Sequence, residues 1–188
     1  DKEQSNNLEL GLHFDNDRLK YNVSVFQNWF ENFIYAKTLD QYDDFRLIQY
    51  SQTQARFYGV DADLSYQLSP VWNAGLFGDY VRGKLDNDGN APRVPGGRLG
   101  TRFKAVFGDG YSASAEYYHV FNQDDIANYE TDTKGYNMLN LGLAYTGQVN
   151  AKTGYRLYAQ ANNLLDANVY QHESFLANVP QVGRNFTV

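Results

Sequence analysis

A strict alternation of apolar and polar residues is the feature of this sequence that most restricts its fold. Successive side chains of a β-strand point to opposite faces, so the alternation predicts strands with one apolar and one polar face. The first clear case covers residues 8–15, where the apolar positions are Leu8, Leu10, Leu12 and Phe14. A tight turn at Asp15-Asn16-Asp17 leads into a second alternating segment, and the two segments together predict a β-hairpin.

The same hairpin pattern recurs along the chain. Paired alternating segments cover residues 60–67 and 72–80, 99–107 and 111–117, and 139–145 and 155–161. Between the hairpins lie longer stretches rich in Asp, Asn, Gly and Pro, roughly at residues 36–45, 84–97, 122–134 and 164–183. Outer-membrane β-barrels have short periplasmic turns at one rim and long extracellular loops at the other. The sequence therefore predicts an all-β fold, a portion of a transmembrane antiparallel β-barrel.

Aromatic residues recur on the apolar face beside the short turns. They are Phe14 and Tyr21, Tyr66 and Trp72, Phe107 and Tyr111, and Tyr145 and Tyr155. Rings of this kind concentrate at membrane–water interfaces, so these residues predict a periplasmic girdle. A second girdle is expected at the opposite ends of the strands, from Phe33, Tyr35, Tyr80, Tyr117 and Phe121. A simple preference of aromatic residues for strands explains the repetition at one rim less well.

Composition and charge exclude some classes of protein. The mean hydropathy of −0.59 is typical of soluble proteins, but alternation dilutes the apolar residues of membrane strands, so this average does not decide the class. The formal net charge is −6, and without a basic patch nucleic acid is not an expected partner. Charges on the polar face would point into a barrel, where Arg102 and Lys104 are expected to pair with Glu116 across neighbouring strands. The absence of Cys suits an oxidising compartment.

Five short segments follow one another in a recognisable order: YGVDA at residues 58–62, APRVPGGRL at 91–99, YETDTKGY at 129–136, NNLLD at 162–166 and GRNF at 183–186. In this order and at these spacings they resemble TonB-dependent outer-membrane receptors. The resemblance covers most of the chain and implies a multi-pass protein of the bacterial outer membrane. It also implies that residues 1–188 form the carboxy-terminal portion of a barrel of about 22 strands. They would supply about eight strands and the start of a ninth at residues 184–188.

The resemblance further implies partners and a function. Family members are filled by a plug domain and driven by the TonB energy-coupling complex through an amino-terminal region, and both regions are missing from these residues. Outer-membrane lipid and lipopolysaccharide are the other expected partners. We expect no enzymatic activity, because the sequence has no nucleophile elbow and no phosphate-binding Gly-rich loop. Asp61 and Asp63 could imitate a catalytic carboxylate pair, but they lie in a segment that resembles a barrel strand of the family.

The imported ligand is the least determined property. The segments VYQHESFL at residues 169–176 and PQVGR at 180–184 are most similar to receptors for zinc uptake, and haem or a ferric siderophore is the alternative. No permanently bound cofactor is expected. The candidate metal ligands are His172, Glu173 and His119, although solvated or structural roles remain open for each, and missing segments would have to complete the site. A protein of another class, a surface-exposed binding or antigen module without transport, and a passive porin or enzymatic barrel are the competing hypotheses.

Overall fold

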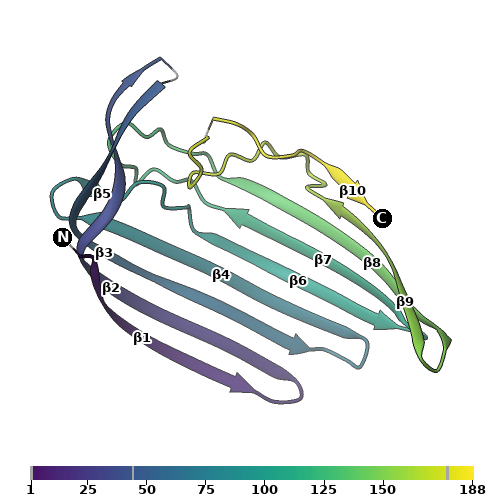
Figure 1. The fold of residues 1–188 in the computed structure, drawn as a ribbon. Helices are drawn as coiled ribbons and strands as arrows, with labels where there is room; N and C mark the ends of the chain where they lie inside the picture. Colours follow the sequence, from purple (N-terminus) through teal and green to yellow (C-terminus); the bar gives the residue numbers. More distant parts are fainter. Residues whose placement is uncertain (1, 44, 177) are drawn as a thin grey trace.

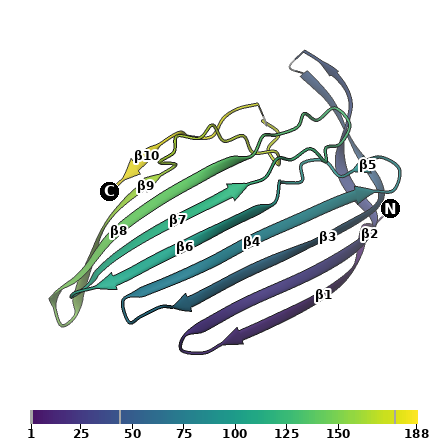
Figure 2. The ribbon, with the colours of Figure 1, turned by 180° about the vertical axis from the view of Figure 1, so that it is seen from behind.

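The computed structural model describes residues 2–43, 45–176 and 178–188, which form one curved antiparallel sheet (Figures 1 and 2). Its strands are β1 (Gln4–Asp15), β2 (Leu19–Tyr42), β3 (Phe45–Gln67), β4 (Trp72–Leu85), β5 (Gly89–Asn90), β6 (Arg98–Phe107), β7 (Tyr111–Val120), β8 (Tyr136–Asn150), β9 (Thr153–Asn162) and β10 (Asn185–Thr187). Neighbours in the sheet are also neighbours in sequence, and only the short β5 lies off this path, paired with β4. The predicted all-β antiparallel fold is confirmed, including the start of the last strand at β10.

Side chains and glycines close the turns at one end of the sheet, which we call the turn end. Asn16 Oδ1 accepts hydrogen bonds from the backbone N–H groups of Arg18 (2.9 Å) and Leu19 (2.7 Å). In the β6–β7 turn, Gly110 has a φ of +96°, and a Cβ atom there would lie 2.1 Å from the carbonyl oxygen of Thr146. These turns fix the register of the hairpins on either side.

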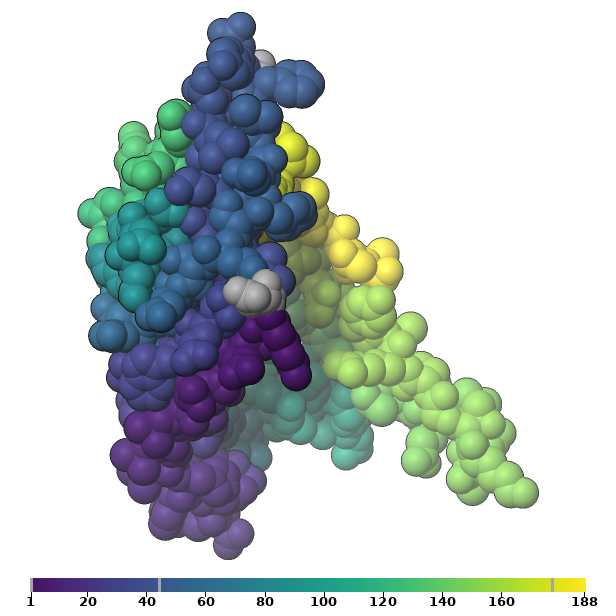
Figure 3. Space-filling view, turned by 60° about the vertical axis from the view of Figure 1, so that its left-hand side comes forward, coloured from purple at the N-terminus to yellow at the C-terminus, as the bar shows by residue number. Residues whose placement is uncertain are grey.

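The opposite end, which we call the loop end, differs from the prediction in one place. The prediction of a loop at residues 36–45 is wrong, because β2 and β3 remain paired as far as Tyr42 and Phe45. This hairpin stands above the rest of the molecule at the top of Figure 3. Its apolar and aromatic residues, such as Leu47 and Tyr50, favour strands, and they outweigh the turn-forming aspartates. The other three long loops are confirmed, as residues 86–97, which contain β5, 121–135 and 163–184.

A β-bulge in β2 exchanges the two faces of the strand. Phe30 pairs with Ala55, but the next pair is Phe33 with Thr53, so β2 carries one extra residue, and Asn32 has a φ of 55° there. An extra residue turns the side chains that follow it to the other face, and here the exchange lasts until a second extra residue between Thr38 and Asp40 reverses it. Phe33 therefore packs against a buried cluster made by Tyr35, Ala55, Leu85, Ala91 and Val94. The expectation that Phe33 and Tyr35 belong to an outward girdle is wrong for this reason.

The apolar face is solvent-exposed in this chain and carries contacting aromatic rings near the turn end. Leu10 and Leu143 have 72% and 62% of their surface exposed. The ring centroids of Phe14 and Tyr21 are 5.5 Å apart, those of Phe107 and Tyr111 6.1 Å, those of Tyr111 and Tyr145 4.6 Å, and those of Tyr145 and Tyr155 5.9 Å. Tyr66 and Trp72 are 39% and 54% exposed. The role of these rings as a membrane girdle stays a prediction.

The last long hairpin extends farther than the sequence suggested. β8 continues to Asn150 and β9 begins at Thr153, so the turn lies at residues 151–152. Tyr145 consequently lies five residues before the end of β8, whereas Tyr155 is two residues into β9, as Tyr21 is in β2. The hairpin projects at the lower right of Figure 3. Across the described part of the chain, no helix is long and apolar enough to span a membrane.

The polar face carries ion-paired side chains and aromatic rings that lie over glycines. Arg102 contacts Asp63 at 2.5 Å and Glu116 at 3.0 Å, which confirms the predicted pairing of Arg102 with Glu116. Lys104 was also expected to pair with Glu116, but in the register of β6 and β7 it lies opposite Ser114. The Arg102 guanidinium also lies 3.9 Å from the ring centroid of Phe77.

Candidate functional site

The loops at the loop end are fastened to one another by Gln123. Its backbone N–H and C=O groups bond to those of Thr133 at 2.9 and 3.0 Å, which closes the loop at residues 121–135 on itself. Its side-chain Nε2 donates to the carbonyl oxygens of Val94 (2.7 Å) and Pro95 (3.2 Å) in the loop at residues 86–97. Gln123 is only 7% exposed, so these bonds are protected from water and hold the two loops together.

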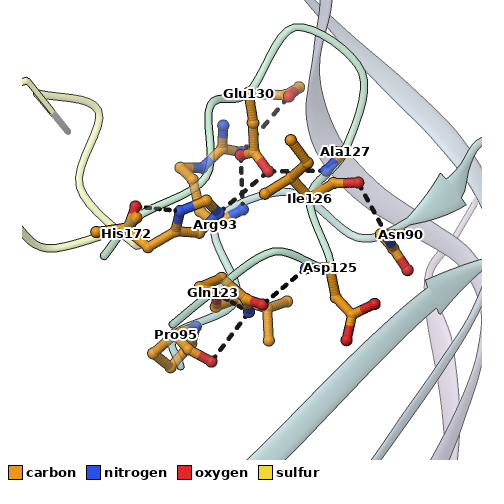
Figure 4. Close-up of polar contacts among 12 residues, drawn as sticks. Asn90, Arg93, Pro95, Gln123, Asp125, Ile126, Ala127, Glu130 and His172 are labelled. Carbon is orange, nitrogen blue, oxygen red and sulfur yellow. Dashed lines mark hydrogen bonds and ion pairs between the residues drawn. The ribbon is translucent and has the colours of Figure 1, made fainter. Parts of the chain in front are cut away.

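Glu130 is the centre of a second set of contacts, shown in Figure 4. Its Oε1 accepts a hydrogen bond from the backbone N–H of Arg93 at 2.9 Å. Its Oε2 accepts one from the backbone N–H of Ala127 at 3.0 Å and lies 3.3 Å from Nε2 of His172. Glu130 therefore joins all three long loops.

His172 lies in the last loop, where the sequence placed it, but it is buried. The side chains of His172 and Glu130 are 5% and 8% exposed. The other ring nitrogen of His172, Nδ1, lies 2.7 Å from the hydroxyl oxygen of Thr133. Both ring nitrogens of His172 therefore have a hydrogen-bonding partner, Glu130 at Nε2 and the Thr133 hydroxyl at Nδ1.

The electrostatics keep Glu130 ionised. Burial by itself would raise the pKa of its carboxyl group, but hydrogen bonds from His172, Ala127 and Arg93 and the charge of the imidazole outweigh burial and lower the pKa. A carboxylate that accepts several hydrogen bonds is stabilised in its charged form. The site therefore presents a fixed negative charge next to an imidazole at neutral pH.

A polar cavity of about 270 Å³ lies beside His172. It is enclosed by the polar face of the sheet on one side and by the last loop on the other, with lining residues that include Arg98, Tyr118, Tyr136, Gln171, His172 and Glu173. Sites for drug-sized ligands usually measure about 300–1,000 Å³. The cavity is thus of a size for an ion or a small chelate, and its charged lining residues are both acidic, Asp79 and Glu173, and basic, Arg98 and Lys134.

The structure brings together only part of the predicted metal-ligand set. His172 and Glu173 both line the cavity, and Glu173 is exposed. His119 is not among the lining residues; it lies on β7, with Nδ1 2.9 Å from Asn137 Oδ1 and its ring edge-on to Phe121. Within the described ranges, no group of three or more His, Cys, Asp or Glu side chains is placed to hold a metal ion.

Sequence reasoning missed Glu130 as the acidic neighbour of His172. The two residues are 42 positions apart, and Glu173 was chosen because it is adjacent in the chain. Glu130 does lie within the YETDTKGY segment at residues 129–136, together with Thr133. The resemblance of this segment to the receptor family could have pointed to Glu130 and Thr133. It did not indicate which other loop of the chain the segment would contact.

The extended hairpin is anchored to the same loops by charged groups. Tyr35 donates a hydrogen bond to Asp88, and Lys37 Nζ lies 2.8 Å from an Asp88 oxygen. Burial, followed by the bond to Asp88, raises the pKa of Tyr35 to about 12. The bond from Lys37 is the largest cause of a lowered pKa at Asp88.

A further contact joins strand and loop, because Arg82 on β4 forms an ion pair with Asp125. In the same region, the guanidinium of Arg93 lies 4.4 Å from the ring centroid of Phe175 in the last loop. The loop end is therefore a connected body rather than a set of independent loops.

Comparison with known proteins identifies a matching family and solved structures with a similar fold. A family described as TonB dependent receptor-like, beta-barrel, matches residues 1–164. Among solved structures, the copper transporter OprC has a TM-score of 0.85 at 24% identity, over 98% of this chain and 30% of that one. The FrpB iron transporter from Neisseria meningitidis has a TM-score of 0.74 at 12% identity, over 98% and 30%.

A third structure is the ferric-catecholate import receptor Fiu from E. coli, with a TM-score of 0.65 at 18% identity, over 98% of this chain and 27% of that one. At these identities the likeness concerns the fold. This chain spans less than a third of the length of each of these three proteins.

Proposed function

Because the chain belongs to the TonB-dependent receptor β-barrel family, we propose that it forms part of the wall of an energised importer for a metal or metal complex. Members of this family are β-barrel proteins of the Gram-negative outer membrane, and this location applies to the chain. Residues 1–188 would form one continuous portion of the barrel. The turn end would face the periplasm and the loop end the exterior, as the lengths of the connections indicate.

The remaining partners follow from this assignment. A plug domain would sit against the polar face, and the TonB complex would supply energy by moving that plug. Lipid and lipopolysaccharide would contact the apolar face and its aromatic residues. The chain itself would bind and guide a ligand rather than catalyse a reaction.

We assign zinc as the metal. The observation that carries this proposal is the buried imidazole of His172 beside an ionised carboxylate, at the edge of a polar cavity of about 270 Å³. Zinc is bound by His nitrogen and carboxylate oxygen. A cavity of this size fits an ion or a small chelate better than haem or a ferric siderophore.

The test uses the full-length receptor folded in detergent, titrated with zinc chloride and separately with haem by isothermal calorimetry. We expect zinc to bind, and His172→Ala to weaken binding at least tenfold. The matched control is His119→Ala, which removes an imidazole outside the cavity and should leave the zinc affinity within twofold.

Uptake by cells separates transport from surface binding. A strain that depends on this receptor should accumulate radioactive zinc only when the TonB complex is intact. Haem binding without zinc binding would overturn the zinc assignment. Zinc binding without TonB-dependent uptake would instead favour a surface-exposed binding or antigen module.

A further inference from the structure

The structure gives His172 an acidic partner that adjacency in sequence did not suggest. Glu130 belongs to the loop between β7 and β8, and His172 to the loop between β9 and β10. We propose that a zinc ion binds between His172 Nε2 and Glu130 Oε2 and so joins these two loops. This inference rests on the proposed function, because it names the protein atoms that contact the imported metal at the mouth of the barrel.

The distance between the two atoms fits a shared zinc ion. In the metal-free structure, Nε2 of His172 and Oε2 of Glu130 lie 3.3 Å apart. Tetrahedral zinc with bonds of about 2.0–2.2 Å places neighbouring ligand atoms about 3.3–3.4 Å from each other. A zinc ion can therefore take the place of the hydrogen bond between the two groups. It would lie beside the straight line from Nε2 to Oε2, and neither backbone would have to move.

The surroundings of the pair match those of metal ligands. A metal-bound imidazole usually has a hydrogen-bond partner at its other nitrogen, which fixes the ring, and ligating carboxylates are themselves hydrogen-bonded. Thr133 provides the first contact, at 2.7 Å from Nδ1 of His172. The backbone N–H groups of Ala127 and Arg93 provide the second, on the two oxygens of Glu130. Both ligands are oriented before any metal arrives.

Burial and charge strengthen this arrangement. The side chains of His172 and Glu130 are 5% and 8% exposed, so both ligand atoms are shielded from water. A divalent cation would neutralise a buried negative charge there. Glu173, in contrast, is exposed and therefore more strongly hydrated.

Two protein ligands leave coordination positions open. No third His, Cys, Asp or Glu completes the site within the part of the chain that the structure describes. Structural zinc sites are usually closed by four protein ligands, whereas sites with open positions accept water or substrate. An open site suits an importer, which must release its metal, and its open positions would be filled by water or by other ligands of the imported metal.

The test compares Glu130→Gln with the matched control Glu173→Gln in the full-length receptor. In calorimetric titration with zinc chloride, the Kd should rise at least tenfold for Glu130→Gln and change by less than twofold for Glu173→Gln. Gln retains a carbonyl oxygen that can accept from Arg93 or Ala127, so the loop keeps much of its support. Cobalt(II) serves as a spectroscopic probe, and its visible absorption should decrease in the first variant only.

Hydrogen exchange of the unmodified receptor gives a second readout that does not depend on any variant. Zinc should slow amide exchange in residues 127–135 and 170–175 together, because the ion connects the two loops. Zinc binding without protection of either segment would overturn the proposed site while leaving zinc import intact. A larger effect of Glu173→Gln than of Glu130→Gln would also overturn it. Absence of zinc binding altogether would instead refute the proposed function.

Discussion

Replacement of Gly100 by Ala should destabilise the barrel wall through a single overlap. Gly100 lies on β6 between Phe77 of β4 and Tyr118 of β7. A Cβ atom there would lie 2.5 Å from Cζ of Phe77 and 2.6 Å from Cβ of Tyr118. Ordinary carbon–carbon contacts are about 3.5–4.0 Å, so the Phe77 ring would have to move by about 1 Å.

The ring of Phe77 cannot move without losing other contacts. It is only 5% exposed, and the guanidinium groups of Arg102 and Arg98 lie 3.9 and 5.4 Å from its centroid. Overpacking of this kind costs about 1–3 kcal/mol, and each weakened cation–π contact adds about 0.5–1 kcal/mol. With two such contacts, we therefore expect a loss of about 2–5 kcal/mol.

The assay is urea unfolding of the full-length receptor in detergent, followed by tryptophan fluorescence. Gly11→Ala is the matched control, because a Cβ atom at Gly11 would meet nothing within 4 Å. Adding Phe77→Leu to Gly100→Ala should recover part of the loss, since the smaller side chain relieves the overlap. Equal midpoints for Gly100→Ala and Gly11→Ala would refute the reasoning.

Other expectations follow from the charged and buried contacts. The hairpin anchor has a pH window: the stability that Asp88 contributes is present above its ordinary carboxyl pKa and lost as pH falls through its lowered value. The contribution of Tyr35 is present below about pH 10 and is lost as pH rises towards its pKa of about 12. A spin label at Gln41 should therefore become more mobile at both extremes, and constant mobility would contradict this. Gln123→Ala should cost about 1–3 kcal/mol locally and speed proteolysis of residues 86–97, whereas an unchanged cleavage rate would show that its bonds are dispensable. Arg102→Met removes two exposed ion pairs and the cation–π contact with Phe77 and should cost about 1–2 kcal/mol; a larger, salt-sensitive loss in urea unfolding would show that the pairs act as a network.

The strands and turns were predictable because their signal is local. Alternation and turn-forming residues such as Asn16 act within a few positions, and neighbouring strands in this sheet are also neighbours in sequence. The extension of β2 and β3 to Tyr42 and Phe45 was missed because aspartates near the tip suggested a loop. The bulge at Asn32 was missed because a single extra residue leaves no distinct pattern in the sequence.

The candidate site was predictable only in part, for a related reason. His172 could be selected by residue type and by its place in a long loop. Its contact with Glu130 depends on how two long loops, one between β7 and β8 and one after β9, fold against each other at the loop end. The preferences of individual residues for strands or turns do not indicate such a contact. Adjacency in sequence pointed to Glu173, whereas the three-dimensional arrangement buries the more distant carboxylate.

The bulge at Asn32 exchanges the two faces of β2 over a limited stretch. Before it, odd-numbered residues such as Tyr21 and Val23 share the apolar face, and after it the odd-numbered Tyr35 turns towards the buried cluster. A second shift between Thr38 and Asp40 adds another residue to β2 and restores the original alternation near the tip. Removal of one residue at Asn32 would therefore turn the projecting part of the strand to the opposite face, while the apolar stretch before the bulge would keep its register.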